Sequence, residues 1–565
     1  MTQVALFLAG AAFAHGVARW GGLPATPLLL LVGFAMTQTG LLPRELVQDA
    51  LMLGLTFLLF VVGVEMSPRQ VKAQRRAALW VGLLQFTTLV VLGTLGSLVL
   101  GLDLLTAVYL GVALTASSSL VVVRLLQQRR QRFEPSGRLV VGVLLVQNVL
   151  IILLIPVLIR LTDGWTAVGG SVLGTAALVA LAFLAQRQLA PSLARLQGDE
   201  ELLLLSALAV LFSFVGIAHL LALPVAAGAF LAGVTLSPFP VSGLLRGPLT
   251  PVVVFFTAIF FLALGGLLTT PSPGVLLHAL VLAVVVLTAT PLVVAAAAER
   301  FGFAARPALE TGLLLSQTSE LSLVVGLHAL LIGHLSQDTF STLVLVTVAT
   351  MVLTPFLARE KVVRLLLRLH PRPGGSAVRA PYAGHVVLLG CGSGGMPLLE
   401  TLVSAGEEVV VIDDDPEIIG RLQEGAVACV HGDATDPEVL RSAGVERAKL
   451  VCSTIRRPRD NERLLELVRE IPVLVRVFDD EDVAWVEGYG GTAILQSELA
   501  AAEFCRWFRS WPGGGRGAPG LDPDLRGRER IEHARAQRDP EARSAPAHAT
   551  GRRDGRPGDR QPPDP

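Results

Sequence analysis

Three polar clusters inside long apolar stretches carry the residue types that bind or transfer ions. They are Thr115-Ala116-Ser117-Ser118-Ser119, the pair Gln147-Asn148, and Ser316-Gln317-Thr318-Ser319-Glu320. Hydroxyl and amide oxygens can ligate a dehydrated monovalent cation, and a carboxyl group can also take up a proton. An ionisable group inside a membrane span is costly, so Glu320 calls for a functional reason. These clusters predict an ion pathway; the alternative is that they only bond helix carbonyls or hold helices together.

A glycine pattern in the last third of the chain indicates a second kind of chemistry. Gly390, Gly392 and Gly395 have the G-x-G-x-x-G spacing directly after the apolar run Val386–Leu389, a predicted strand. The next predicted strand ends in Asp413, close to the offset expected for a ribose-binding carboxylate. Glycines let the backbone approach a pyrophosphate at a helix N-terminus, where amides and dipole favour anions. This order predicts a site for NAD(H) or another adenine nucleotide.

The residues after this pattern complete a doubly wound parallel sheet. Its later strands are predicted at Val427–Val430, Leu450–Ser453 and Val473–Val477. Asp433 follows the first of these, where it can accept a bond from an adenine amino group or a ribose hydroxyl; an ordinary turn or helix cap is the alternative. No second substrate domain and no candidate for hydride transfer follow. We therefore expect a domain that senses its nucleotide, and no enzymatic or catalytic residues.

Composition separates these two regions. The chain is 52% hydrophobic and 16% charged, whereas a soluble globular protein carries about 25% charge. Its formal net charge is zero, which gives no case for a nucleic-acid partner. The four cysteines lie after residue 390 without metal-ligand spacing, so we expect no metal site and a reducing compartment.

The apolar stretches are long enough to cross a membrane, which takes about 20 residues each. Thirteen candidate spans are 2–18, 24–41, 47–65, 77–100, 103–126, 138–159, 166–186, 201–221, 223–237, 252–269, 274–298, 308–333 and 338–357. Basic residues gather after the odd-numbered spans, for example Arg69 to Arg76 and Arg124 to Arg138. Because cytoplasmic loops are enriched in Lys and Arg, this predicts a multi-pass protein of the plasma (inner) membrane with its N-terminus outside and its C-terminal domain in the cytoplasm.

The fifth and twelfth spans contain the first and third polar clusters and run in opposite directions. Polar interruptions at matched places in two halves indicate an inverted repeat with broken helices and a site at the membrane midplane. We expect a transmembrane domain at 1–360, a linker at 361–384, the nucleotide-binding domain at 385–511, and a disordered tail at 512–565 that is rich in Gly, Pro, Arg and Asp.

Taken together, these motifs resemble the Kef-type potassium/proton antiporters of the monovalent cation:proton antiporter superfamily, which carry a TrkA-N (RCK) nucleotide-binding domain. The resemblance extends from residue 1 to about 505 and rests on Phe60–Glu65, Thr115–Arg124, Gly142–Asn148, Leu313–Val325, Gly390–Gly395, Ile412-Asp413 and Gly432–Thr435. It implies an α-helical, NhaA-like antiporter fold in which the fifth and twelfth spans cross around an ion site facing the sixth. It also implies a homodimer in membrane lipid, gated by nucleotide.

Two positions depart from the family pattern. The family has Asp where this chain has Asn148, and usually a Lys in the span before the Ser-Gln-x-x-Glu helix, near Thr290. An aspartate can bind a cation and a proton alternately, whereas an asparagine does not titrate. Glu320 could take over the proton.

The resulting hypothesis is a potassium or sodium:proton antiporter gated by a cytoplasmic nucleotide-binding domain. A nucleotide-gated uniporter or channel-like conduit, and a transport-dead sensor, remain alternatives because of Asn148. A membrane-anchored NAD-dependent oxidoreductase is a third, although one span would suffice to anchor it.

Overall fold

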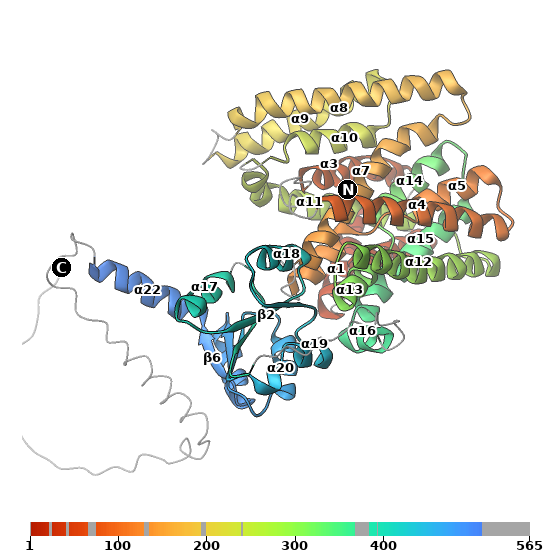
Figure 1. Cartoon of the computed structure of the whole chain (residues 1–565). Helices are drawn as coiled ribbons and strands as arrows, with labels where there is room; N and C mark the ends of the chain where they lie inside the picture. Colours follow the sequence, from red (N-terminus) through yellow and green to blue (C-terminus); the bar gives the residue numbers. More distant parts are fainter. Residues whose placement is uncertain are drawn as a thin grey trace, which may run out of the picture. The chain divides into compact units, whose positions relative to one another are not determined.

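The computed structural model of the 565-residue chain describes residues 2–21, 25–40, 44–65, 75–128, 135–193, 199–238, 241–367, 383–392 and 394–510. Residues 1–496 form one compact unit. Its N-terminal part is entirely helical among the described residues (Figure 1). The helices are α1 (Thr2–Gly21), α2 (Ala25–Gln38), α3 (Arg44–Glu65), α4 (Arg75–Val99), α5 (Leu104–Ala113), α6 (Ser119–Gln128), α7 (Pro135–Ile159), α8 (Trp165–Leu193), α9 (Glu200–Leu220), α10 (Val225–Thr235), α11 (Val241–Gly266), α12 (Pro273–Arg300), α13 (Ala305–Leu315), α14 (Glu320–Leu331), α15 (Gln337–Leu357) and α16 (Glu360–Leu367).

The fifth and twelfth predicted spans are both broken helices. Residues 114–118 separate α5 from α6, and residues 316–319 separate α13 from α14. Serine and threonine favour such breaks because their hydroxyls offer the backbone local partners outside the helix. Ser319 caps α14 in this way: its hydroxyl accepts from the Leu321 amide, and the Ser322 hydroxyl accepts from the Ser319 amide. The sequence prediction of two interrupted helices is therefore confirmed.

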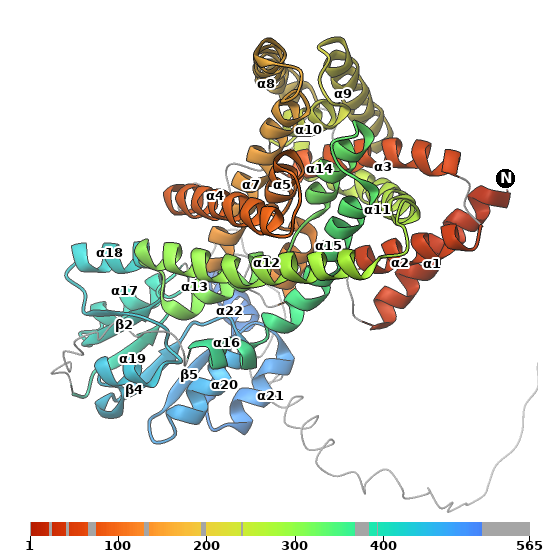
Figure 2. The same ribbon diagram turned by 90° about the vertical axis from the view of Figure 1, so that its right-hand side faces the viewer.

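Glycines let neighbouring membrane helices approach closely. A Cβ added at Gly63 on α3 would overlap the Phe230 carbonyl on α10, and one added at Gly233 would overlap the Phe60 carbonyl on α3. Helices in a membrane associate mainly through such small-residue contacts, because lipid gives no hydrophobic drive between them. In the resulting bundle α3 packs against both α10 and α11, and α11 packs against α2 (Figure 2).

Eight described helices are long and apolar enough to cross a membrane, by length and composition. They include α4, α7, α12 and α15, and the broken pair α13–α14 counts as one. Four shorter apolar helical stretches fall below that length, among them α5, which ends at the break after Ala113, and α10, which follows the turn at residues 221–224. The predicted count of thirteen spans stays a prediction, whereas the multi-span helical architecture is confirmed.

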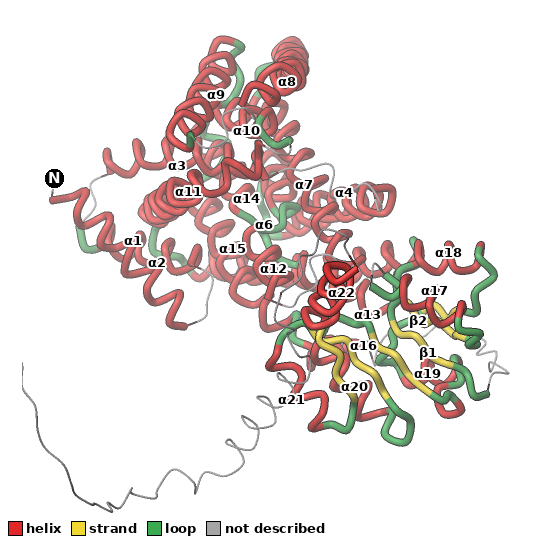
Figure 3. Tube along the Cα trace, turned by 90° about the vertical axis from the view of Figure 1, so that its left-hand side faces the viewer, coloured by secondary structure: helices red, strands yellow, loops and turns green. Residues whose placement is uncertain are grey.

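The C-terminal part of this unit is a six-stranded parallel sheet in the order β3-β2-β1-β4-β5-β6. The strands are β1 (Val386–Leu389), β2 (Val409–Asp413), β3 (Cys429–His431), β4 (Leu450–Ser453), β5 (Val473–Val477) and β6 (Thr492–Leu495). The segments between and after them contain α17 (Met396–Ser404), α18 (Pro416–Glu424), α19 (Pro437–Ser442), η3 (Val445–Arg447), α20 (Pro458–Leu467), α21 (Asp480–Gly488) and α22 (Gln496–Ser510). Figure 3 shows helices on both faces of the strands. This is the Rossmann strand order, as predicted.

The burial of each strand agrees with its position in the sheet. All four residues of β1 and all five of β2 are buried, as expected for central strands covered by helices on both faces. The sixth strand, Thr492–Leu495, is not predicted from the sequence: it is an edge strand, exposed at its first residue, and its apolar run, Ala493–Leu495, is only three residues long. The predicted linker 361–384 begins with most of helix α16, and its residues 368–382 lie outside the described residues. The predicted tail 512–565 also lies outside them.

Candidate functional site: the helix crossing and the sheet edge

The two broken helices meet at their breaks. The Ser117 hydroxyl donates to the Leu315 carbonyl at 2.7 Å, which joins the two unwound stretches directly. One residue on, the Ser118 hydroxyl donates to Glu320 Oε1 at 3.0 Å. Ser117, Ser118 and Glu320 are all buried. We call residues 114–119 and 315–320, together with Asn148 on α7, which contacts Ser119, the crossing. The structure thus brings the first and third predicted clusters into contact.

The second predicted cluster, on α7, reaches the same place. Asn148 Nδ2 donates to the Ser119 hydroxyl at 3.3 Å, while Asn148 Oδ1 is buried with no hydrogen-bond partner in the described structure. Gln317 Oε1, in the other break, is likewise buried and unpartnered. Buried polar oxygens are almost always satisfied, so each exception calls for an explanation. Unpartnered amide oxygens are the ligands that a dehydrated monovalent cation would take.

Gln147 has a different position from its neighbour. Its Oε1 accepts from the Ser117 amide at 3.1 Å, and its Nε2 donates to Gln85 Oε1 on α4. Gln85 Nε2 in turn donates to the Thr115 carbonyl at 3.4 Å. Both polar groups of Gln147 are thus used to hold the unwound backbone of residues 115–117. Sequence analysis missed Gln85, although a lone amide in the apolar span 77–100 was the available signal.

A stripe of threonines on α15 holds the other break. Thr350 Oγ1 accepts from the Thr318 amide at 3.1 Å, and Thr318 Oγ1 donates to Thr347 Oγ1 at 2.9 Å. Thr354 Oγ1 donates to the Ser316 carbonyl at 3.1 Å. The three α15 threonines recur at helical spacing, which places them on one face. This spacing is visible in the sequence and indicates a polar face on the last predicted span.

The remaining predicted residues of the crossing bond locally. Thr115 Oγ1 donates to the Val112 carbonyl and Ser316 Oγ to the Leu313 carbonyl, each at 2.7 Å. These bonds cap the C-terminal ends of α5 and α13, where helix carbonyls lack amide partners. The crossing therefore combines two unwound stretches held by side-chain bonds, two unpartnered amide oxygens and one buried carboxylate, Glu320. Such a set can bind a cation and hold a proton at separate atoms.

The glycine turn after β1 has the geometry that a nucleotide phosphate needs. Gly390 has φ +79°, which favours glycine, and a Cβ at Gly395 would overlap the Gly390 carbonyl. A Cβ at Gly392 would meet nothing within 4 Å, so this position faces open space. The turn leads directly into the N-terminus of α17, whose dipole favours an anion, although Pro397 has no amide hydrogen and the Met396 amide donates to the Gly392 carbonyl.

Asp413 lies at the carboxyl end of β2, beside that turn. Its Oδ2 accepts from the Cys391 amide, and its Oδ1 accepts from the Asp415 amide at 2.8 Å. Burial raises the pKa of Asp413, against the lowering effect of these two amides. Burial and the Asp413 charge raise the pKa of the Cys391 thiol to about 11. Each Asp413 oxygen keeps a second lone pair, so the carboxylate can still accept from ribose hydroxyls.

Asp433, at the carboxyl end of β3, is engaged on both oxygens. Oδ1 accepts from the Thr435 amide and hydroxyl, each at 2.8 Å, which makes the turn that sequence analysis gave as the alternative. Oδ2 accepts from Arg306 Nη1 at 3.0 Å. Burial alone would raise the pKa of Asp433, but the Arg306 guanidinium and the Thr435 donors lower it below its ordinary value.

Two arginines that sequence analysis did not single out lie near the glycine turn. The Arg476 guanidinium packs against Gly394, and Arg476 lies over the Phe478 ring at 4.9 Å. Arg456 lies over the same ring at 5.8 Å. Burial and the neighbouring Arg456 lower the pKa of Arg476. Two cations on one ring next to the turn favour an anion there, such as a phosphate.

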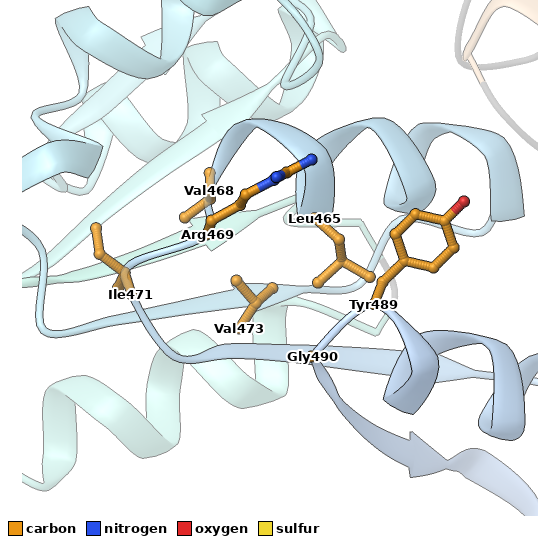
Figure 4. A pocket seen from close by; sticks show the side chains of 7 residues that line it. All are labelled: Leu465, Val468, Arg469, Ile471, Val473, Tyr489 and Gly490. Carbon is orange, nitrogen blue, oxygen red and sulfur yellow. The ribbon is translucent and has the colours of Figure 1, made fainter.

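A cavity of about 340 Å³ lies elsewhere in this domain (Figure 4). It is lined by Leu465, Val468, Arg469, Ile471, Val473, Tyr489 and Gly490. Val473 begins β5, so the cavity is at the amino ends of the strands, whereas the glycine turn is at their carboxyl ends. Ligands of such sheets bind at the carboxyl ends. No group of His, Cys, Asp and Glu in the described part of the chain is placed to hold a metal ion.

Two family models match the chain, one over its helical part and one over its sheet. The family model for the transmembrane sodium/hydrogen exchanger matches residues 4–359, and the model for the TrkA-N domain matches residues 386–496. The chain belongs to the sodium/hydrogen exchanger family, as a Kef-type cation/proton antiporter with a C-terminal TrkA-N domain.

Individual relatives cover most of the chain. It is 29% identical over 83% of its length to the glutathione-regulated potassium-efflux system protein KefC of Klebsiella pneumoniae (strain 342), of which it covers 78%. It is 30% identical to KefC of Klebsiella pneumoniae subsp. pneumoniae, over 74% of this chain and 69% of that one. The solved sodium proton antiporter of Methanocaldococcus jannaschii has a TM-score of 0.50 at 14% identity, over 66% of this chain and 99% of the other. That likeness confirms the predicted antiporter fold.

Proposed function

We propose that this protein exchanges potassium for protons across the plasma (inner) membrane, at a rate set by NAD(H) or another adenine nucleotide on the TrkA-N domain. The crossing carries the proposal: it joins two broken helices, two unpartnered amide oxygens and a buried carboxylate. The names of the potassium-efflux relatives favour potassium over sodium. This chain is a transporter on this proposal and needs no catalytic residue.

The ion site uses the predicted residues in two roles. Asn148 and Gln317 offer their oxygens to the cation, and the hydroxyls of Ser118 and Ser119 lie beside them. Glu320 takes the proton, because it is the carboxylate that Ser118 contacts and Asn148 cannot titrate. Gln147, Thr115, Ser117 and Ser316 keep the unwound backbone in place. Cation and proton then compete through charge rather than for one shared aspartate.

The nucleotide site uses the turn of Gly390, Gly392 and Gly395 for phosphate, with Arg476 as a further cation. Asp413 accepts from the ribose hydroxyls, and Asp433 from the adenine amino group or a hydroxyl. A bound nucleotide would add phosphate charge and hydrogen-bond donors at the sheet edge. The turn fits such a ligand because Gly392 faces open space while Gly390 and Gly395 enforce the tight bend.

The arrangement in the membrane follows from charge. Basic loops after alternate spans favour an N-terminus outside and a cytoplasmic TrkA-N domain. We place the transmembrane domain at 1–360 and the nucleotide-binding domain at 385–511, and we expect a homodimer in lipid.

The test is cation flux in vesicles that contain the purified protein and a pH dye. An imposed potassium gradient should move protons in the opposite direction, more than a sodium gradient does, and NADH or ADP should change the rate. Potassium flux without proton movement would replace exchange with a nucleotide-gated uniporter. Vesicles without flux of either cation under any nucleotide would leave a transport-dead sensor.

A further inference from the structure

Two membrane helices each carry an arginine that contacts the carboxyl edge of the sheet, where the nucleotide is proposed to bind. We call this edge the nucleotide edge. Arg138, near the start of α7, pairs with Asp415 at 3.0 Å, and Arg306, near the start of α13, pairs with Asp433 at 3.0 Å. Asp415 and Asp433 follow β2 and β3, at the carboxyl ends of those strands. These are the strand ends at which a nucleotide binds in this fold. The ion-carrying helices and the nucleotide edge are therefore held together by charge.

Arg306 is the more deeply embedded of the two. Its side chain is 9% exposed, and besides Asp433 it contacts Asp460 at 2.8 Å and Glu310 at 3.1 Å. Arg457 completes the group by pairing with Glu310 at 3.3 Å and Asp460 at 3.5 Å. We call these five residues the ionic cluster. Charge-assisted bonds away from water are stronger and more directional than surface pairs, so the cluster fixes the start of α13.

The same two helices carry the ion site. Asn148 is ten residues after Arg138, and Ser316 is ten residues after Arg306. At about 1.5 Å per residue, each arginine lies about 15 Å along its helix from the crossing. Helices are rigid elements that can carry a displacement along their length. A displacement at the arginine therefore reaches the crossing, where α13 ends and the Leu315 carbonyl accepts from Ser117.

We infer that nucleotide and Arg306 compete for the Asp433 side chain, so that nucleotide binding frees the start of α13 and alters the crossing. The inference rests on the proposed nucleotide site. Asp433 Oδ1 is used by Thr435 and Oδ2 by Arg306, so an incoming amino or hydroxyl group must displace or share with the guanidinium. Because the two binding events are linked, a change that weakens the contact between Arg306 and Asp433 raises the affinity for nucleotide. Bound nucleotide in turn weakens the contact between Arg306 and Asp433.

The test is calorimetry of NADH and of ADP binding to the full-length protein in detergent. Arg306→Gln removes the competitor, so affinity should rise about tenfold, the equivalent of one charge-assisted bond. Arg306→Lys keeps the charge without the planar fork and should raise affinity less. Arg160→Gln is the matched control: Arg160 forms an exposed pair with Asp163 on a loop far along the chain from the sheet, and affinity should not change.

The outcomes of these experiments distinguish a failure of the proposed nucleotide site from a failure of the proposed competition between nucleotide and Arg306. If neither nucleotide binds the unaltered protein, the proposed site fails. If nucleotide binds with the same affinity to the unaltered protein, Arg306→Gln and Arg306→Lys, the competition is wrong. In vesicles, Arg306→Gln should make cation flux insensitive to nucleotide; a flux response equal to that of the unaltered protein would also overturn it. If Arg306→Gln does not fold, the Arg306→Lys affinity and flux decide.

Discussion

The crossing and the ionic cluster both bury polar groups, but they differ in whether those groups have protein partners. At the crossing, Asn148 Oδ1 and Gln317 Oε1 are buried and unpartnered, and the groups around them are mostly neutral. In the ionic cluster, charges are buried but every one contacts an opposite charge, as Arg306 does with Asp433 and Asp460. Buried oxygens without a hydrogen-bond partner indicate a place where a ligand binds. A network in which every charge is paired indicates a contact that holds two parts of the protein together.

The difference also separates two kinds of function. A site that must bind and release an ion gains from oxygens that have no competing protein partner. A contact that must hold the first turn of a helix in place is more stable when several strong bonds form at once. Such a contact is released only when a ligand competes for one of those bonds. The predictions below test this contrast by removing or adding charge at each place.

The largest effect is expected for Glu320→Gln at the crossing. This change keeps the shape and the Ser118 contact but removes the group that titrates, so proton-coupled cation flux should fall about 100-fold. The measurement is potassium-driven pH change in vesicles. Glu200→Gln, at the first turn of α9, is the control and should transport normally. Full proton coupling in Glu320→Gln would show that the proton is carried elsewhere.

A gain is expected for Asn148→Asp. Unlike asparagine, an aspartate titrates, so the new group would be protonated at low pH and charged at higher pH. Cation binding needs the charged form, and flux should therefore rise with pH, by about tenfold across the titration. Vesicle flux at a series of pH values measures this. A pH profile identical to that of the unaltered protein would place Asn148 outside the coupling site.

In the ionic cluster, Asp433→Asn should reduce the free energy of unfolding by about 3 kcal/mol without nucleotide, because it leaves Arg306 with fewer opposite charges. The pKa of Asp433 is lowered below its unfolded value, so its stabilisation is present at neutral pH and lost as pH falls below about 4. Denaturant unfolding of both proteins at pH 7 and at about pH 2 measures the difference.

The control for the cluster is Asp163→Asn, which breaks the exposed pair with Arg160. That change should cost less than about 1 kcal/mol, because water screens exposed pairs. Equal losses for Asp433→Asn and Asp163→Asn would mean that the cluster holds nothing.

The smallest effect is expected in the glycine turn. Gly395→Ala places a methyl group on the Gly390 carbonyl and should destabilise the TrkA-N domain by about 2 kcal/mol. Gly392→Ala meets open space, so the fold should be unchanged while nucleotide affinity falls. Thermal unfolding and calorimetry of the two variants separate the roles. Equal unfolding temperatures would contradict the close contact at Gly395.

Much of the fold could be predicted from local pattern. The apolar stretches gave the helical membrane domain, and strand, glycine turn and acid gave the parallel sheet. The edge strand Thr492–Leu495 was missed because its apolar run is only three residues long, shorter than the runs that indicate a buried strand. The site was predicted less completely: Gln85 and the α15 threonines bond across helices that are far apart in the sequence. A hydrophobic pattern carries no information on such partners.

The sequence by itself determined where the helices break and where the sheet turns, because hydroxyl and glycine residues act on the backbone next to them. It also determined that Asn148 cannot titrate. Only the tertiary structure decided that Gln147 supports the backbone while Asn148 keeps a free oxygen, and that Asp433 bonds to Arg306. Those outcomes depend on which side chains meet across packed helices, and packing is a property of the whole fold.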